Sequence, residues 1–358
     1  MTHFFPSVVI ILPIRNESGF IEHGLRAILE QDYPGEVEIL IADGMSTDNT
    51  REIIDDFSAR HPQLKICILD NPREIVPTGI NIALRKAKGE IVIRLDGHTT
   101  IAPDYVRQCV ETLQRTHADN VGGKMNSIGS NPFGHAVALA TSTPFGIGGG
   151  RFHYSDKEEW VDTVYMGAWP RRVFEKIGMF DEELVRDQDD EFNYRLRAYG
   201  GKIFLSPKIR STYSVRSDLR TLWRQYFQYG FWKVRVLQKH PRQMCLRQFV
   251  PPVFVLALLI SAFLALSTFF FPFLHAQRPS FILCLSSFLP ALYLLVNLAA
   301  SIYTSHRRRA WSRFPFLILA FAILHLSYGL GFLVGLASFA DRWGDKHGAT
   351  PVFVGKEA

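Results

Sequence analysis

An aspartate and a histidine stand two residues apart in the segment IVIRLDGHTT, at positions Asp96 and His98. A carboxylate and an imidazole can together hold a divalent ion against a diphosphate. Such an ion acts as a Lewis acid and neutralises the charge that builds on a leaving phosphate. A turn with an incidental histidine is the alternative, and the pair by itself does not decide between the two interpretations.

The segment ADGMSTDNT offers a second set of polar groups. Asp43 stands where an apolar run ends, and its carboxylate can accept hydrogen bonds from the N–H groups of a nucleotide base. Thr47 or Asp48 can cap the helix that follows. A plain strand, turn and helix with capping acids explains the same residues, so both interpretations stay open.

Four acids lie within five positions of the segment RDQDDEFNYRLRAYGGKI. Acids at the start of a helix are often only partners of the helix dipole. Repulsion among so many carboxylates nevertheless favours a raised pKa within the group, which suits a general base that takes a hydroxyl proton. The four acids are Asp187, Asp189, Asp190 and Glu191.

Strand patterns and helix patterns alternate through the first half of the chain. Strict alternation predicts an α/β fold, with a mostly parallel sheet and helices on both faces. Neither a P-loop motif nor a GxGxxG motif occurs. The predicted strands are residues 8–12, 37–42, 65–69 and 91–95, and the predicted helices are residues 17–31, 47–60, 78–88 and 103–116.

Polar residues follow the predicted strands directly. Ligands of such sheets bind beyond the carboxyl ends of the strands, so we expect the polar groups there to share one site. Pro13, Asn16 and Glu17 follow the first strand, Asp43 the second, and Asp96 and His98 the fourth.

The chain is almost wholly apolar from about residue 250 to residue 340. Residues 250–274 and 281–303 carry no charge, and residues 314–340 contain no Asp, Glu, Lys or Arg and a single histidine, His325. A bilayer is spanned by about 20 apolar residues, so we expect three transmembrane helices. Buried core helices are the alternative.

Basic residues in the short loops predict the orientation of these helices. The loop 304–313 contains Arg307, Arg308, Arg309 and Arg313, whereas the loop 275–280 contains only Arg278. The positive-inside rule places the arginine-rich loop in the cytoplasm. With three spans, we expect an inner-membrane, multi-pass protein whose N-terminal domain is cytoplasmic and whose tail after Asp341 lies outside.

Between the two halves, basic and aromatic residues alternate. The stretch 216–247 contains eight Lys or Arg residues and one acid, which is typical of a segment attracted to anionic lipid. An interfacial helix is favoured, and a helix packed on the catalytic domain is the alternative. We therefore predict a catalytic domain at 1–215, an interfacial segment at 216–249, transmembrane helices at 250–340 and a short tail at 341–358.

Composition adds weaker constraints. The net charge of +6 is modest, and we expect no nucleic-acid partner. Four scattered cysteines without a CxxC pair argue against a disulfide framework or zinc site and fit a reducing cytosol. The opening residues have no basic region and only a short apolar run, so we interpret them as a buried strand rather than a signal peptide.

Taken together and in order, five motifs resemble family 2 of the inverting glycosyltransferases, which have the GT-A fold. The resemblance covers roughly residues 6–235 and is strongest to bacterial exopolysaccharide glycosyltransferases of the succinoglycan type. The motifs are PIRNE, ADGMSTDNT, GINIALRKAKGEIVIRLDGH, GAWPRRVFEKIGMFDEEL and DQDDEFNYRL.

The resemblance implies a role for each matching residue. His98 departs from the family's usual Asp-x-Asp, and Gln188 replaces the Glu of its Glu-Asp base motif, which leaves Asp189 as the expected base and Asp190 and Glu191 as rivals. Pro13, Asn16, Glu17, Asp43 and Asp96 would bind the nucleotide, Asp96 and His98 a Mn²⁺ or Mg²⁺ ion, and Gly167 and Ala168 would form a small-residue turn beside the acceptor.

The implied reaction is a direct displacement that moves a sugar, with UDP-glucose as the family-level donor. The implied acceptor is a polyprenyl-diphosphate-linked saccharide at the membrane, in exopolysaccharide or cell-surface glycan synthesis. Two alternatives remain: a polyprenyl-phosphate glycosyltransferase, whose acceptor is already ionised, and a non-catalytic membrane-bound sensor of nucleotide sugars.

Overall fold

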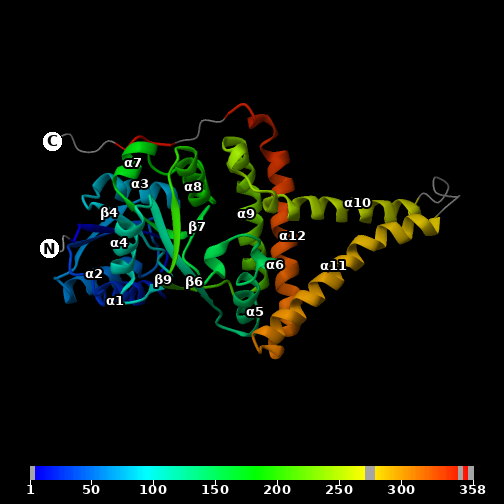
Figure 1. The fold of residues 1–358 in the computed structure, drawn as a ribbon, viewed down its shortest axis with the longest axis horizontal. Coiled ribbons are helices and arrows are strands. Elements are labelled where there is room, and N and C mark those ends of the chain that lie inside the picture. Colours follow the sequence, from blue (N-terminus) through cyan, green and yellow to red (C-terminus); the bar gives the residue numbers. More distant parts are fainter. Residues whose placement is uncertain (1–4, 271–278, 346–349, 354–358) are drawn as a thin grey trace. The chain divides into compact units, whose positions relative to one another are not determined.

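A computed structural model describes residues 5–270, 279–345 and 350–353 (Figure 1). The chain folds into two compact units, each built from separate stretches of sequence. Unit 1 comprises residues 1–127, 150–214 and 345–358, and unit 2 comprises residues 128–149 and 215–344. The segment 128–149 therefore belongs to the unit that contains the C-terminal helices, and the tail belongs to the unit that contains the sheet. The sequence-based domain boundaries at 215, 249 and 340 did not include either assignment.

Half of the sheet in unit 1 is parallel. β1 (Val8–Ile14) pairs in parallel with β2 (Val37–Asp43) and β4 (Ile91–Arg94), and β2 pairs in parallel with β3 (Lys65–Asp70). Every residue of β1 is buried, as expected for a parallel strand that is covered on both faces. The four predicted strands are thus confirmed.

The other half of the sheet is antiparallel, which makes the sheet mixed. The strand order is β3-β2-β1-β4-β8-β6-β9-β5, with β7 paired to β9. The antiparallel half begins where β8 pairs with β4, with Ala168 of β8 opposite Ile93 of β4. The added strands are β5 (Thr99–Ile101), β6 (Asn120–Ile128), β7 (Glu159–Val161), β8 (Tyr165–Pro170) and β9 (Ile203–Ser214).

Helices cover both faces of this sheet, as the alternating pattern predicts. Alternate residues of β1 enter two different cores, Ile10 one and Ile11 the other. α1 (Ile21–Leu29), α2 (Thr50–Arg60) and α4 (Tyr105–Thr116) contribute to the first core, and α3 (Val76–Lys86), α7 (Arg172–Ile177) and α8 (Gln188–Ala198) to the second.

The C-terminal tail returns to unit 1. The carbonyl of Pro351 accepts a hydrogen bond from the N–H of Met179 at 3.0 Å. Phe353 is buried in the second core, with its ring centroid 6.3 Å from that of Phe174 and the guanidinium carbon of Arg171 5.2 Å from its centroid. This tail is thus a structural part of the sheet-containing unit.

Unit 2 is helical, and its longest interface joins two helices that run in the same direction. α9 (Leu219–Lys239) packs along α12 (Phe314–Ser338), while α5 (Pro132–Thr141) and α6 (Pro144–Ile147) pack on α12 as well. α10 (Val250–Phe270) and α11 (Pro279–Arg307) pack on each other and extend from this group (Figure 1). Short 3-10 turns are Arg151–His153, Pro241–Gln243, Leu246–Gln248, Trp311–Arg313 and Ala340–Arg342.

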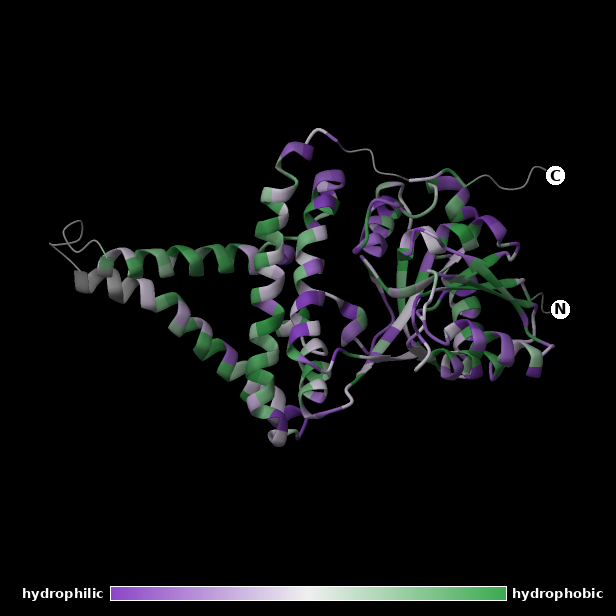
Figure 2. Ribbon diagram, turned by 180° about the vertical axis from the view of Figure 1, so that it is seen from behind, coloured by the Kyte–Doolittle hydropathy of each residue, from purple (hydrophilic) through white to green (hydrophobic). Residues whose placement is uncertain are grey.

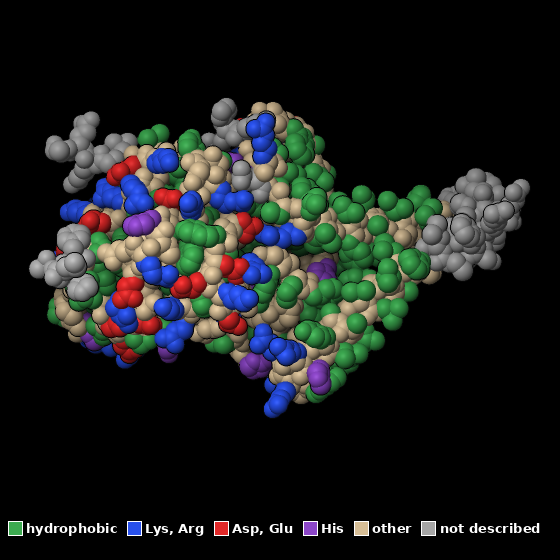
Figure 3. All heavy atoms as spheres, viewed as in Figure 1, with side chains coloured by type: hydrophobic (Ala, Val, Ile, Leu, Met, Phe, Trp, Pro, Cys, Tyr) green, Lys and Arg blue, Asp and Glu red, His purple; other side chains and the backbone are tan. Residues whose placement is uncertain are grey.

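Among the described residues of unit 2, three helices are long and apolar enough to cross a membrane, but they differ in their surroundings. The α10 and α11 spans are 11% and 17% buried within the protein, whereas the α12 span is 50% buried. Hydrophobic residues run along α10, α11 and α12, while α9 is more polar (Figure 2). Figure 3 shows apolar side chains over the visible faces of α10 and α11. Most of the predicted loop 275–280 falls outside the described residues.

Candidate functional site

Hydrogen bonds fasten the loop after β1 to the loop after β2. Asn16 adopts a left-handed backbone with φ of 55°, and its N–H donates to the Ser46 hydroxyl at 2.8 Å. Its side-chain oxygen accepts from the N–H of Thr47 at 2.8 Å. The N–H of Glu17 donates to the Thr50 hydroxyl at 2.8 Å. Asn16 and Glu17, two of the predicted nucleotide-binding residues, therefore lie in one connected pair of loops, and Pro13 in β1 sits opposite Ala42 at its base.

Asp43 ends β2 with its side chain fully buried. One carboxylate oxygen accepts from the Ser46 hydroxyl at 2.5 Å, and the other accepts from Arg51 Nε at 2.5 Å. Arg51 also reaches Asp70 at the end of β3, at 2.5 Å. The guanidinium thus joins the ends of two neighbouring strands, and Asp43 is held rigidly at the sheet edge.

A buried arginine joins the two carboxylates that the sequence analysis assigned to separate tasks. Arg94 is the last residue of β4, and its Nε and Nη2 donate to Asp96 Oδ1 at 3.1 and 2.8 Å. Its Nη1 donates to Asp189 Oδ1 in the first turn of α8. Asp96 and Asp189, which are far apart in sequence, therefore lie on either side of one guanidinium.

The same cluster gives its two carboxyl groups opposite pKa shifts. Burial acts to raise the pKa of Asp96, but Arg94 and then His98 outweigh it, so the pKa is lowered. Loss of water contact raises the pKa of Asp189, and the opposing charge of Arg94 does not cancel this effect. Asp96 is therefore fitted to stay ionised, whereas Asp189 is fitted to accept a proton.

Tyr165 of β8 supports this cluster from the neighbouring strand. Its hydroxyl lies 2.7 Å from the Thr99 hydroxyl and helps to lower the pKa of Asp96 through a hydrogen bond. Burial raises the pKa of Tyr165 itself well above the ordinary tyrosine value, so the phenol stays protonated and can donate.

His98 lies beside the loop after β1. Its Nδ1 is 3.1 Å from Glu17 Oε1, and its ring centroid is 5.4 Å from that of Tyr213. Gly97 permits this approach, because a Cβ at that position would lie 3.0 Å from the Glu17 side chain. Glu17 thus orients the imidazole next to Asp96, which is the type of support that metal-binding histidines receive. The described residues contain no cluster of three or more acidic, histidine or cysteine ligands.

The four acids near the start of α8 separate into different environments. Asp187 precedes the helix with a left-handed φ of 60°, and Asp190 accepts from the Thr163 hydroxyl at 3.3 Å. Glu191 is buried and accepts two hydrogen bonds from Arg195, both at 2.9 Å. Arg195 also donates to the carbonyls of Ile177 and Met179. Glu191 therefore belongs to a structural ion pair, whereas Asp189 contacts Arg94.

Gly167 and Ala168 lie within β8 rather than in a turn. Gly167 has a φ of 51°, and a Cβ there would lie 2.3 Å from the Trp169 ring and 2.8 Å from Asn120 Oδ1. Ala168 is fully buried in the first core. Steric crowding inside the protein thus explains both small residues, and their predicted place beside an acceptor remains a prediction.

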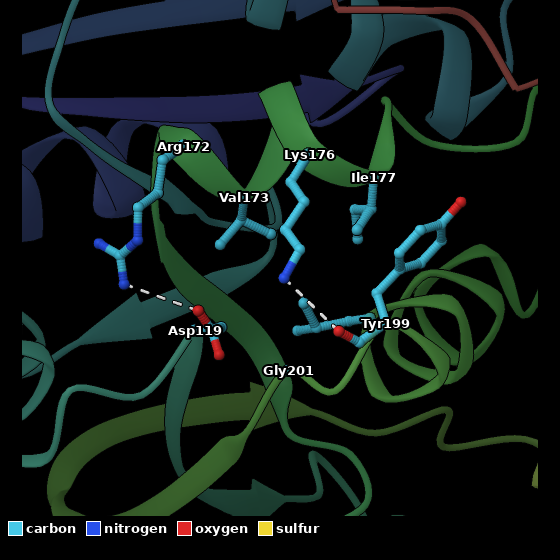
Figure 4. A pocket seen from close by; sticks show the side chains of 8 residues that line it. Asp119, Arg172, Val173, Lys176, Ile177, Tyr199 and Gly201 are labelled. Carbon is cyan, nitrogen blue, oxygen red and sulfur yellow. Dashed lines mark hydrogen bonds and ion pairs between the residues drawn. The ribbon is translucent and has the colours of Figure 1, made fainter.

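A separate cavity of about 230 Å³ lies between α7 and the end of α8 (Figure 4). Arg172 lies 3.6 Å from Asp119, and Lys176 donates to the carbonyl of Tyr199 at 3.5 Å. None of the predicted site residues lines this cavity. The candidate site is therefore the strand-end cluster and not this hollow.

Sequence reasoning missed Arg94, Tyr165 and Arg195. Arg94 carried a usable signal, because a charged residue that ends the apolar run IVIR must find a partner when the strand is buried. Tyr165 and Arg195 carried none, since their roles depend on which strand or helix packs beside them.

Comparisons with known proteins bear on the family and the fold. Residues 9–178 match the family described as "Glycosyl transferase family 2". The chain is 32% identical over 247 residues to the succinoglycan biosynthesis protein ExoA of Rhizobium meliloti (strain 1021), which covers 68% of this chain and 74% of that protein.

A second relative and a solved structure extend the comparison. A dolichyl N-acetyl-alpha-D-glucosaminyl phosphate 3-beta-D-2,3-diacetamido-2,3-dideoxy-beta-D-glucuronosyltransferase of Methanococcus voltae is 31% identical over 239 residues, covering 65% of this chain and 74% of that protein. The mannosyltransferase PcManGT of Pyrobaculum calidifontis, solved with GDP-Man and Mn²⁺, has a TM-score of 0.56 at 20% identity, covering 90% of this chain and 88% of that one. The latter likeness concerns the fold.

Proposed function

Because the chain belongs to glycosyltransferase family 2 and has the GT-A fold, we propose that it transfers a sugar from a nucleotide to a saccharide hydroxyl on a lipid-linked acceptor, with inversion. The observation that carries this proposal is the Arg94 bridge between Asp96 and Asp189. It brings a carboxyl group whose pKa is lowered and one whose pKa is raised to the same end of the sheet.

Asp189 is the proposed base. Its side chain is 38% exposed, so an acceptor hydroxyl can reach it, and its raised pKa favours proton uptake. Glu191 is unsuited, since Arg195 holds both of its oxygens in a buried pair. With one base and no residue assigned as a nucleophile, the sugar is displaced once and its anomeric configuration inverts, as in the single-displacement glycosidases.

Asp96 and His98 are the proposed protein ligands of a Mn²⁺ or Mg²⁺ ion. Their chemistry fits such an ion, because a carboxylate that remains ionised and an oriented imidazole are competent donors. The ion would neutralise charge on the leaving diphosphate when bound. The GDP-Man and Mn²⁺ named for PcManGT support this assignment.

The connected loops after β1 and β2 are the proposed nucleotide pocket. Asn16 and Glu17 would position the donor, and Asp43 would recognise the base, with Arg51 and Ser46 fixing its carboxylate. UDP-glucose is the proposed donor. Recognition of a planar base edge needs a rigid acceptor, and the hydrogen bonds from Ser46 and Arg51 hold the Asp43 carboxylate in place. Asp43 is enclosed in this structure, so the loop that carries Ser46 would have to open for the base to reach it.

The proposed acceptor is a saccharide on a polyprenyl diphosphate, used at the cytoplasmic face of the inner membrane. The apolar helices of unit 2 support a membrane location. The name of the Methanococcus voltae relative describes an acceptor sugar joined to a dolichyl phosphate. A sugar hydroxyl needs a base, and the environment of Asp189 supplies one.

The deciding experiment replaces Asp189 with Asn and compares it with Asp190→Asn. Loss of the base should lower transfer about 10²–10⁴-fold, while nucleotide binding to membranes that contain the variant stays within about twofold of wild type. Asp190→Asn changes the same charge one residue away and should retain most activity. Wild-type turnover in Asp189→Asn would remove Asp189 from the mechanism.

The same variants separate the alternatives. A polyprenyl-phosphate acceptor is already ionised, so retained transfer to that lipid in Asp189→Asn would favour this reaction. A non-catalytic sensor would bind nucleotide but show neither transfer nor donor hydrolysis in the wild-type protein. UDP- and GDP-sugars, each assayed with and without Mn²⁺, provide the donor test.

A further inference from the structure

The chain leaves unit 1 and later returns to it, and this limits how it can cross a membrane. Residues 150–214 belong to unit 1, and so do Pro351 and Phe353. The return is anchored by the Met179–Pro351 hydrogen bond and by the burial of Phe353 among Phe174 and its neighbours. Both ends of the intervening segment therefore lie on the same side of any bilayer, which requires an even number of crossings.

The connection after α12 cannot supply a crossing of its own. Backbone that spans lipid must be helical or part of a closed barrel, because every polar group has to be satisfied internally. The connection from Phe339 to Thr350 is short and carries Asp341, Arg342 and Asp345. Among three candidate helices, one therefore does not cross.

Glycines bring α9 and α12 into direct backbone contact. A Cβ on Gly230 would lie 2.0 Å from the carbonyl oxygen of Tyr328, and one on Gly331 would lie 2.0 Å from that of Phe227. Gly335 approaches the carbonyl of Phe231 in the same way, at 2.6 Å. Such small residues allow helices to pack with little space between them.

This contact extends over most of the length of both helices. Leu222 shares a buried cluster with Phe321 near one end, and Gln238 donates to the carbonyl of Phe339 at 2.7 Å near the other. The sixteen residue steps from Leu222 to Gln238 correspond to about 24 Å of helix, against a hydrocarbon core of about 30 Å. A membrane-spanning α12 would consequently carry α9 into the bilayer.

The composition of α9 opposes such a position. Arg224, Lys233 and Arg235 lie within the segment that contacts α12. Each cation at the centre of a membrane helix costs about 2.5–3.5 kcal/mol on insertion scales. Arg235 lies 5.9 Å from the Phe339 ring and donates to the carbonyl of Arg342 at 3.4 Å, so the end of α12 is tied to a charged residue.

α10 and α11 have the opposite character. They pack on each other, and large aliphatic and aromatic side chains cover their outer faces, including Phe263, Leu294 and Leu295, which are 70%, 62% and 64% exposed. Water is a poor solvent for so much continuous apolar surface. These two helices therefore require lipid.

We propose that α10 and α11 cross the bilayer as a hairpin, while α9 and α12 lie together along the membrane surface on the side of unit 1. The partner of the α9–α12 pair is the lipid surface itself. Exposed Trp223, Trp311 and Phe316 provide apolar contacts at headgroup depth, and exposed Arg220 and Arg224 provide cations for anionic lipid. This topology replaces the three-span prediction and is independent of the proposed function.

Cysteine labelling of the full chain tests this topology. In a background whose four native cysteines are replaced, Gly344→Cys follows α12 and has open space around its Cβ. Ser280→Cys marks the first turn of α11, and Lys157→Cys marks the exposed surface of unit 1. A membrane-impermeant maleimide is added to intact spheroplasts and, separately, to opened membranes.

Two-crossing topology predicts that Ser280→Cys reacts in intact spheroplasts, whereas Gly344→Cys and Lys157→Cys react only after opening. Reaction of Gly344→Cys in intact spheroplasts while Lys157→Cys stays protected would establish an odd number of crossings and overturn the proposal. Protection of Ser280→Cys would show that α10 and α11 do not cross, which also overturns it.

Reporter fusions give a measurement that does not depend on cysteine replacement. Green fluorescent protein fused after Ala358 of the otherwise native chain should fluoresce, and alkaline phosphatase at the same place should be inactive. The reverse pattern, with Lys157→Cys still protected in intact spheroplasts, would place the C-terminus and unit 1 on opposite sides and contradict the even number of crossings.

Discussion

Two buried arginines of unit 1 are used in different ways. Arg195 binds both oxygens of Glu191 and two backbone carbonyls, so its charge is satisfied within the protein interior. Arg94 is divided between Asp96 and Asp189, and Asp189 remains 38% exposed. The enclosed Arg195 cluster therefore has a structural role, whereas the Arg94 cluster has an exposed carboxylate that a substrate can contact.

Removal of Arg94 should give the largest loss of activity. Arg94→Met leaves Asp96 and Asp189 without the cation between them, so they repel each other and the site loses its geometry. We expect transfer to fall by about 10²-fold or more, by analogy with loss of positioning groups. Initial-rate assays on membranes with matched protein content provide the measurement, and an unchanged rate would mean that the bridge is only structural.

A substitution in the Arg195 cluster should lower the stability of the fold and not the activity. Glu191→Gln removes one partner of a buried ion pair, which costs about 3–5 kcal/mol. The protein should unfold at a lower temperature, while the fraction that stays folded keeps nearly normal turnover, because both oxygens of Glu191 are bound by Arg195. Turnover that falls much more than the folded fraction would assign Glu191 a catalytic role.

Tyr165→Phe tests the support of Asp96 with a milder change. The variant loses the hydrogen bond that helps to lower the pKa of Asp96, and it leaves the Thr99 hydroxyl without its partner. A hydrogen bond to a charged group is worth about 1.5 kcal/mol or more, so we expect the Mn²⁺ concentration for half-maximal activity to rise by roughly tenfold. An unaltered Mn²⁺ dependence would separate Tyr165 from the Asp96 site.

The pH profile provides a further test of Asp189. Its pKa is raised above 3.8, so a base in this position is protonated at a higher pH than an ordinary aspartate. The acid limb of kcat/KM should therefore lie above pH 3.8, with activity lost as pH falls through it. Asp190 contributes to the raised value, so Asp190→Asn should move the limb to lower pH. A shift in the opposite direction would contradict the assignment.

The smallest effect is expected in the loop that fastens β1 to β2. Hydrogen bonds from Thr50 and Ser18 lower the pKa of Asp48 from 3.8 to about 2. A lowered value means that Asp48 stabilises the fold above about pH 4 and loses this contribution as pH falls toward 2. Asp48→Asn should therefore reduce the pH dependence of unfolding in that window, measured by acid titration, and leave activity at neutral pH nearly unchanged.

The sequence predicted the parallel half of the sheet well, because runs such as VVIILPI are apolar throughout and are followed by polar residues. It did not predict the antiparallel half, where β6 contains NVGGKMNSI and β9 contains IFLSPKIRSTYS. Those strands mix polar and apolar residues, and their pairing depends on partners far away in the chain. The helices α1 and α2 begin later than predicted, since the residues before them form the connected loops.

Site residues were predictable where they follow strands and unpredictable where they depend on packing. Asp43, Asp96 and Asp189 could be selected because strand ends and helix starts are recognisable in sequence. The separation of Asp189 from Glu191 was not recognisable, because two residues of helix turn one side chain toward β4 and the other toward Arg195. That distinction requires the tertiary structure.

The assignment of residues 128–149 to the helical unit has a practical consequence for anyone who wishes to study the enzyme without detergent. Cutting the gene after Ser214 would remove α9 and α12 but retain α5, whose Phe133, Val137 and Ala140 pack in their shared core. It would also discard Phe353 from the ring cluster around Phe174. A soluble fragment cut in this way would expose two apolar surfaces, the one on α5 and the one around Phe174. A fragment with a shortened α5 and a separately added tail peptide would avoid both.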